Sequence, residues 1–171
     1  KARRRVREGA GKGEGTAAVG LARGVLGGSR RGEVVQVIQG GWSAGEVTAL
    51  ARFDGLLEWR TAGEGFGGET QDEAREIGAC ARAWDVAREA LRRTDVDLVV
   101  LDELNIALRY DYLPLSTVLA DLAGRPQRQH VVITGRNAPA DLITAADLVT
   151  EMTLVTHHFK SGVKAQEGIE F

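Results

Sequence analysis

The chain has 171 residues, of which 43% are hydrophobic and 27% charged, and its formal net charge is −2. These values are ordinary for a soluble globular protein and favour a single domain over residues 1–171. They exclude a general nucleic-acid partner, which needs a strongly basic balance, and no apolar run approaches the ~20 residues of a membrane span.

Cysteine usage and the first residues bear on the compartment. Cys80 is the only cysteine, so neither an intrachain disulfide nor a cysteine-based zinc site is expected. The basic start KARRRVR has no apolar region after it, so no secretory signal peptide is predicted. A cytoplasmic location is therefore expected. Residues 1–8 are interpreted as a solvated terminal arm, because blocks of like charge usually stay in water.

The first half of the chain alternates helical and apolar segments. Small residues from Thr16 to about Leu26 predict a helix that ends at two glycines. The apolar run 33–38 is typical of a buried strand. A short helix over 46–53 and a strand over 56–59 follow, and a glycine-dense loop comes next.

The clearest helix begins near a capping box formed by Thr70 and Glu73. Apolar side chains then recur at helical spacing and predict one buried face, with Cys80 expected in the core rather than in chemistry. The positions on that face are Ile77, Ala81, Trp84, Ala87 and Leu91.

The second half continues the alternation. The segment DLVVLDEL, residues 97–104, predicts a buried strand that ends in two acids, and a helix is expected from Pro114 to about Leu122. A further apolar strand, a short helix opened by Pro139 and a last strand over 147–152 complete the pattern. Repeated strand–helix alternation with apolar strands predicts an α/β fold with a mostly parallel sheet flanked by helices.

Three polar segments follow predicted strands or open predicted helices. They are the glycine loop GAGKGEGT (Gly9–Thr16), Asp102 with Glu103, and Thr134-Gly135-Arg136. Each has a plain structural alternative: a turn, a helix cap and a surface ion pair. Together they suit a nucleotide triphosphate, because ligands of parallel sheets bind beyond the carboxyl ends of the strands. Backbone N–H groups and arginine bind phosphate oxygens, and a carboxylate holds Mg²⁺.

From about Val34 to Phe171 the chain resembles the ATP:corrinoid adenosyltransferases of the CobA/CobO/BtuR type, the cob(I)yrinic acid a,c-diamide adenosyltransferases. The resemblance rests on the ordered segments VVQVIQGGW, GEGF with ETQD, DLVVLDEL, RPQRQHVVITGRNAP, AADLVTEM and GVKAQEGIEF. It implies a P-loop, RecA-like fold, usually dimeric. It also implies transfer of the 5′-deoxyadenosyl group of ATP to Co(I) of a corrinoid, with Mg²⁺, and an external electron donor such as a flavoprotein.

The resemblance also implies roles for individual residues. Residues 8–16 align with the family's phosphate loop, T-G-N-G-K-G-K-T-T, with Glu8 at its first threonine. The residues that would bind nucleotide are Gly9, Ala10, Gly11, Lys12, Gly13, Glu14, Gly15 and Thr16. Arg136 would grip the triphosphate. Metal ligands would come from Glu103, Asp102 and Thr16, with Glu103 also serving the nucleotide. The corrinoid would meet Phe66, Gly68 and Trp42.

Several of these positions depart from the family pattern. Glu14 replaces the phosphate lysine, Gly15 replaces the threonine that usually binds Mg²⁺, and Gly68 replaces the corrinoid-packing tryptophan. The departures predict weak ATP binding and slow transfer. The alternative is a catalytically impaired homologue that binds nucleotide or corrinoid, and a small nucleoside kinase is a third option without motif support.

Overall fold

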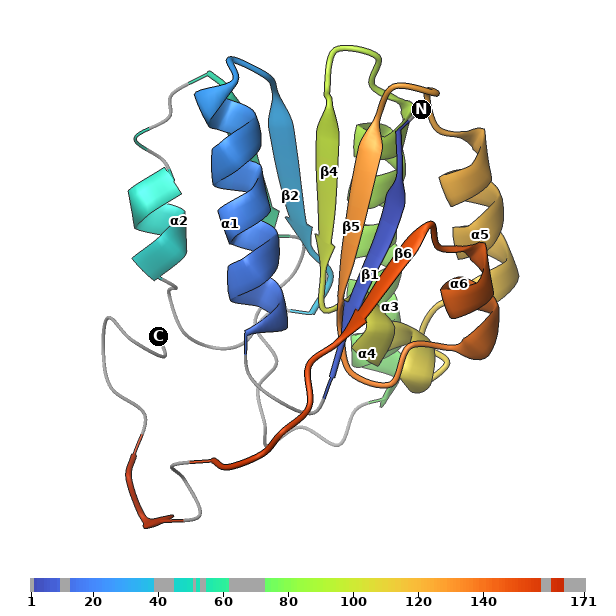
Figure 1. The fold of residues 1–171 in the computed structure, drawn as a ribbon. Helices are drawn as coiled ribbons and strands as arrows, with labels where there is room; N and C mark the ends of the chain where they lie inside the picture. The colour runs from blue at the N-terminus through green and yellow to red at the C-terminus, as the bar shows by residue number, and fades with distance from the viewer. Residues whose placement is uncertain are drawn as a thin grey trace.

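The computed structural model describes residues 2–9, 13–38, 45–50, 52, 55–61, 73–157 and 161–164. Within these ranges strands and helices alternate along the chain (Figure 1). In chain order the elements are β1 (Arg4–Glu8), α1 (Glu14–Gly27), β2 (Gly32–Gln36), α2 (Gly45–Leu50), β3 (Leu57–Thr61), α3 (Glu73–Arg92), β4 (Leu98–Asp102), α4 (Leu104–Arg109), α5 (Leu115–Gly124), β5 (His130–Gly135), α6 (Ala140–Ala145) and β6 (Leu148–Glu151).

The strands form one six-stranded sheet in the order β3-β2-β4-β5-β1-β6, and every neighbouring pair is parallel. The predicted α/β fold is confirmed and is consistent with a P-loop NTPase-like domain. Because all six strands run the same way, their carboxyl ends lie at one edge of the sheet. None of the helices in the described ranges is both long and apolar enough to cross a lipid bilayer.

Helices cover both faces of the sheet (Figure 1). On one face, Ala18 and Ala22 of α1 pack against a small apolar cluster that includes Val34 and Val132. The opposite face holds the larger core, to which α3, α4, α5 and α6 contribute. Val34 and Val35 enter different clusters. Apolar residues on both faces of a strand explain why the strands read as continuous apolar runs.

The predicted buried face of α3 is partly wrong. Ile77 is 41% exposed and Ala81 is also exposed. The buried stripe begins at Cys80 and includes Ala83 and Ala90 in place of Ile77 and Ala81. Trp84 lies on both the predicted and the observed face and donates a hydrogen bond from Nε1 to Asp121 Oδ2 of α5 (3.0 Å). Cys80 lies in the core as predicted, and burial raises the pKa of its thiol to about 11. The buried residues of α3 are Cys80, Ala83, Trp84, Ala87, Ala90 and Leu91.

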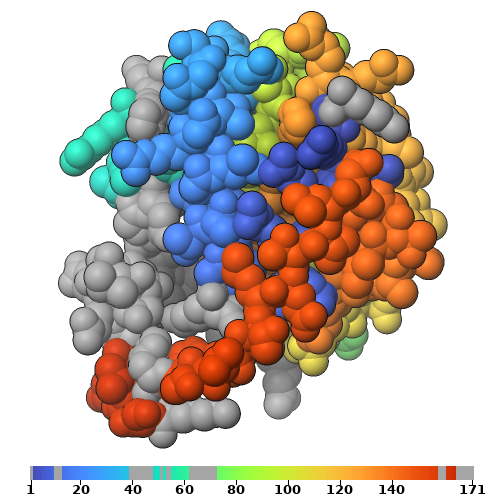
Figure 2. Space-filling model, viewed as in Figure 1, coloured from blue at the N-terminus to red at the C-terminus, as the bar shows by residue number. Residues whose placement is uncertain are grey.

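The prediction that residues 1–8 form a solvated arm is wrong. Residues Arg4–Glu8 form β1, which lies between β5 and β6 and pairs with both. Backbone hydrogen bonding does not depend on the side chains, and Val6 alone enters the core, with 1% exposure. Figure 2 shows atoms of β1 at the surface between α1 and β6, so the strand is partly open to solvent, and its three arginines are half-buried.

Two arginines of β1 carry a cost. Arg5 and Arg7 pair in register with Val132 and Thr134, so they lie on the α1 face of the sheet. Both side chains are half-buried, and the Nε atom of each is buried without a hydrogen-bond acceptor. An unsatisfied buried donor loses its hydration without compensation.

We therefore expect the double substitution Arg5→Val, Arg7→Val to stabilise the protein. Valine removes the unsatisfied donors and suits a strand, which should raise the free energy of unfolding by about 2 kcal/mol. Denaturant unfolding measures this change. The matched control is Arg3→Val, an exposed position just before the strand, which should change stability little. Equal or lower stability of the double variant would contradict the interpretation of β1.

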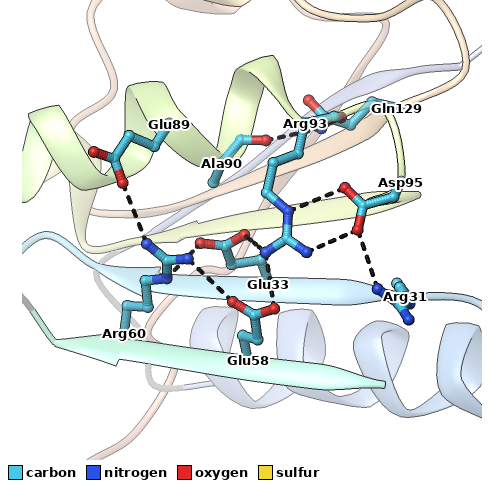
Figure 3. A network of polar contacts seen from close by, with 9 residues as sticks. All are labelled: Arg31, Glu33, Glu58, Arg60, Glu89, Ala90, Arg93, Asp95 and Gln129. Carbon is cyan, nitrogen blue, oxygen red and sulfur yellow. Dashed lines mark hydrogen bonds and ion pairs between the residues drawn. The ribbon is translucent and has the colours of Figure 1, made fainter. Parts of the chain in front are cut away.

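A buried acid, Glu33, links the strands at the β3 edge of the sheet through ion pairs (Figure 3). Glu33 of β2 has a fully buried side chain and lies 2.9 Å from Arg60 Nε of β3 and 3.2 Å from an Nη atom of Arg93. Burial raises the pKa of Glu33, and the two arginines oppose that shift. Glu58 forms ion pairs with the same two arginines, with Arg93 at 2.8 Å and with Arg60 at 3.1 Å. The network ties the edge strand β3 to the end of α3.

Gln129 completes the end of α3 from outside the helix. Its buried amide donates to the carbonyl oxygens of Ala90 and Arg93, both at 3.0 Å. Carbonyls in the last turn of a helix lack the usual helical partner, so Gln129 supplies a donor to Arg93 and a second donor to Ala90, whose carbonyl also accepts from the backbone N–H of Arg93 (3.2 Å). These contacts hold α3 against the start of β5.

Candidate functional site

The three predicted polar segments meet at the carboxyl edge of the sheet. Glu8, at the end of β1, pairs with Gly135 at the end of β5, and β4 runs beside β5. Asp102 closes β4 and Glu103 follows it directly. Arg136 follows β5 and lies exposed, close enough to influence the pKa of Glu103. The described residues of the three segments therefore lie at one edge of the sheet.

A buried threonine joins the ends of β4 and β5. Thr134 donates a hydrogen bond from Oγ1 to Asp102 Oδ1 (2.7 Å). Thr134 Oγ1 also accepts a hydrogen bond from the backbone N–H of Glu103 (3.0 Å). Asn105, in the first turn of α4, donates to the carbonyl oxygen of Gly135 (3.0 Å). These bonds fix both acids relative to β5.

Two glycines allow the backbone segments to approach closely. Gly9 has φ +152°, and a Cβ there would lie 2.0 Å from the carbonyl oxygen of Met152. Gly135 has φ +116°, and a Cβ there would lie 3.0 Å from Glu103 Oε2. A larger residue at either position would push the strand ends apart. Glu103 itself has φ +59°, a left-handed conformation that non-glycine residues adopt mainly at turns and functional sites.

The first turn of α1 faces the two acids. Gly13 caps the helix with φ +118°, and Glu14 opens it. Glu14 is 6% exposed, and its Oε2 atom is buried without a hydrogen-bond donor. A Cβ on Gly15 would lie 3.4 Å from Asp102 Oδ1, so a side chain at this position would stand next to that carboxylate. Thr16 is exposed.

The electrostatics of the site are unfavourable to further negative charge. The pKa of Glu103 is raised to about 7, mainly by burial and also by the charges of Asp102 and Glu14, while Arg136 opposes the shift. Three carboxyl groups therefore act on one another at the strand edge. The sequence places an acid where the family pattern has a cation, and the electrostatic effect of Glu14 on Glu103 gives that departure a physical consequence.

The donor set fits Mg²⁺ only in part. Glu14 Oε2, Glu103 Oε2 and Asn105 Oδ1 are buried oxygens without a hydrogen-bond partner, and a hard cation prefers oxygen ligands. In the part of the chain that the structure describes, no three acid, histidine or cysteine side chains are grouped to hold a metal by themselves. Mg²⁺ usually binds through one or two carboxylates and substrate phosphates, so Asp102 or Glu103 would hold it together with a nucleotide.

Six predicted site residues lie outside the described residues: Ala10, Gly11, Lys12, Trp42, Phe66 and Gly68. Sequence reasoning missed two residues that shape the edge. Asn105 belongs to α4, a helix that the sequence analysis did not predict. Glu8 accepts a hydrogen bond at Oε2 from the backbone N–H of Ala138 (2.7 Å), which ties the segment before α6 to β1. A polar residue at the last position of a strand was the available signal for Glu8.

Comparison with known proteins gives one consistent family. Residues 2–171 match the family described as ATP:corrinoid adenosyltransferase BtuR/CobO/CobP. The chain is 51% identical over 166 residues to the corrinoid adenosyltransferase of Pseudomonas aeruginosa, covering 97% of this chain and 82% of that protein. It is 45% identical over 168 residues to the corrinoid adenosyltransferase of a Sinorhizobium species (97% and 78% covered) and 40% identical over 163 residues to that of Escherichia coli K12 (95% and 82% covered).

The shifted pKa of Glu103 predicts a pH dependence of stability. Between its ordinary pKa of 4.5 and its folded value of about 7, the folded protein holds a proton that the unfolded chain releases. Stability attributable to Glu103 should therefore be present below pH 4.5 and fall as the pH rises through 7, by about 3 kcal/mol at most. Denaturant unfolding at pH 5 and pH 8 should show this loss in the parent and not in Glu103→Gln.

Two variants sharpen that test. Glu14→Gln should lower the pKa of Glu103, because it removes one of the charges that raise it. Glu151→Gln removes an exposed acid of β6 and serves as the control, with the parent's pH dependence retained. A pH dependence that is the same in the parent and in Glu103→Gln would show that Glu103 does not hold the proton.

Proposed function

The chain belongs to the family of ATP:corrinoid adenosyltransferases, and on this basis we propose that it transfers the 5′-deoxyadenosyl group of ATP to a reduced corrinoid. In this reaction the electron pair of Co(I) forms the bond to C5′ as the bond from C5′ to the triphosphate oxygen breaks. Triphosphate leaves with the negative charge. The match over residues 2–171 carries the proposal, and the convergence of polar strand ends supports it.

Because the nucleophile is the cobalt of the substrate, the chain needs to supply only binding, orientation and exclusion of water. The glycine loop Gly9–Thr16 and exposed Arg136 would bind the triphosphate. Asp102 and Glu103 would hold Mg²⁺, which would neutralise phosphate charge when bound. Cys80 takes no part, since it is buried in the core with a raised pKa.

The corrinoid side of the site is proposed from the sequence. Phe66 would press against the lower face of the corrinoid and help displace its axial ligand, with Trp42 and Gly68 nearby. A homodimer, an external electron donor such as a flavoprotein, and a cytoplasmic location form part of the same proposal. They rest on the family resemblance and on cysteine usage.

Spectroscopy tests the proposed reaction directly. We expect that the protein, incubated with ATP, Mg²⁺ and chemically reduced cobalamin, will slowly form a cobalt–carbon bond, which changes the corrinoid spectrum. Omitting ATP is the control for non-enzymatic change. A spectrum that never changes, with ATP still bound, would favour the second candidate, a homologue that binds nucleotide without catalysis. The buried Glu14 is the observation that keeps this candidate open.

The double substitution Glu14→Lys, Gly15→Thr should strengthen ATP binding and speed transfer. A lysine at 14 would bring a cation to the carboxyls of Asp102 and Glu103, and a threonine at 15 would place its hydroxyl beside Asp102 Oδ1. At about 4 Å a unit charge pair is worth ~4 kcal/mol at an intermediate dielectric, so exchanging repulsion for attraction should improve affinity by roughly two decades.

Titration calorimetry with Mg²⁺–ATP measures this gain. The single variant Gly15→Thr separates the hydroxyl from the charge, and Glu151→Lys repeats the charge change at an exposed position of β6. Tight binding by the parent, unimproved by the double substitution, would show that Glu14 does not face the phosphates.

A further inference from the structure

A cavity lies at the amino edge of the sheet, where β1 and β6 begin, at the opposite end of the strands from the candidate nucleotide site. Its volume is about 550 Å³, within the range of about 300–1,000 Å³ typical of small-molecule sites. We call it the amino-edge cavity. It is lined by Ala2, Arg4, Ala123, Arg125, Gln127, Arg128 and Asp147.

The lining carries more positive than negative charge. Three arginines and one aspartate line the cavity. Arg4 Nε lies 3.6 Å from Asp147 Oδ2, and the backbone N–H of Arg4 donates to the same oxygen (2.7 Å). Asp147 therefore balances one arginine, which leaves two positive charges in excess.

Arg125 is held in place without a carboxylate contact. Its Nε donates to the carbonyl oxygen of Gln129 (3.0 Å) and one Nη to that of Leu122 (2.7 Å), so neutral groups orient it. Burial lowers the pKa of Arg125, Arg4 lowers it further, and Asp147 opposes them. An anion bound nearby would therefore stabilise the charged form of the Arg125 guanidinium.

Arg4 lies in the same wall, and its buried Nε makes the long ion pair with Asp147 at 3.6 Å but no hydrogen bond. Buried polar groups in folded proteins are normally hydrogen-bonded, so this guanidinium has hydrogen-bonding capacity left for a ligand or water. Arg128 is exposed at the rim and makes no ion pair with any described residue.

We propose that the amino-edge cavity binds a small organic phosphate. Guanidinium groups present planar forks that match phosphate oxygens, and two excess positive charges match a phosphate dianion. The cavity is larger than a bare phosphate needs, so an organic remainder fits beside the phosphate group. Arg4 and Arg125 form the inner part of the site, and Arg128 closes it at the surface.

Calorimetric titration with inorganic phosphate and with glycerol 3-phosphate tests the site. Both should bind to the parent, and glycerol 3-phosphate should bind more tightly because it fills more of the cavity. The substitution Arg4→Gln, Arg128→Gln should weaken both about tenfold, as expected when charge-assisted hydrogen bonds are lost. Arg23→Gln removes one exposed charge from α1, away from the cavity, and should bind like the parent.

Three results would overturn the proposal. One is the absence of phosphate binding by the parent in the millimolar range. Another is equal affinity in the parent and in the double variant. The last is equal or tighter binding of succinate, which would assign the cavity to carboxylates. Arg128→Gln alone alters an exposed side chain, so it keeps the test valid if the substitution in β1 disturbs folding. Mg²⁺–ATP should not compete with glycerol 3-phosphate, which separates this cavity from the carboxyl edge.

Discussion

Parallel pairing of β1 with β5 is the interaction on which the candidate site depends. It brings Gly9 to the same edge as the ends of β4 and β5 and places α1 over the acids that follow β4. This pairing uses backbone groups, so it does not require apolar side chains. The arginines of β1 stay half-buried, and their Nε atoms lack hydrogen-bond acceptors.

The second constraint is charge. Close packing at the carboxyl edge buries Glu103 near Asp102 and Glu14, and burial together with these two charges raises the pKa of Glu103. Thr134 and Asn105 prevent the edge from relaxing, since their hydrogen bonds lock β4, α4 and β5 together. A site of this kind gains from any cation that enters it, whether a metal ion, an arginine or an engineered lysine.

The fold was largely predictable because the central strands β2, β4 and β5 are rich in apolar residues and buried on both faces. Such runs have few alternatives to a buried parallel sheet, and the turns between them carry clear glycine and proline signals. Strand direction also predicted that the polar residues after β4 and β5 lie at the same edge of the sheet. Asp102 and Arg136 were placed at the candidate site in this way.

The errors have physical reasons. Composition misjudged residues 1–8, because a strand near the sheet's margin needs only one apolar side chain, Val6, to join the core. Helical spacing could not distinguish the buried alanines of α3, Ala83 and Ala90, from the exposed Ala81, because burial depends on which side the sheet covers. The short helix α4 has too few turns for a periodic signal, so Asn105 was missed. Buried charges such as Glu33 depend on partners distant in sequence, which no local pattern reveals.

The central claim is that the carboxyl edge binds a nucleotide through a cation shared with its acids. Titration of the parent with ATP, once in excess Mg²⁺ and once in EDTA, tests it most directly. The account predicts measurable binding with Mg²⁺ and strongly weakened binding in EDTA, because bare polyphosphate would meet three carboxyl groups. We also expect Glu103→Gln to reduce the difference between the ATP affinity in Mg²⁺ and the ATP affinity in EDTA. ATP that binds equally well in EDTA and in Mg²⁺ would contradict the account.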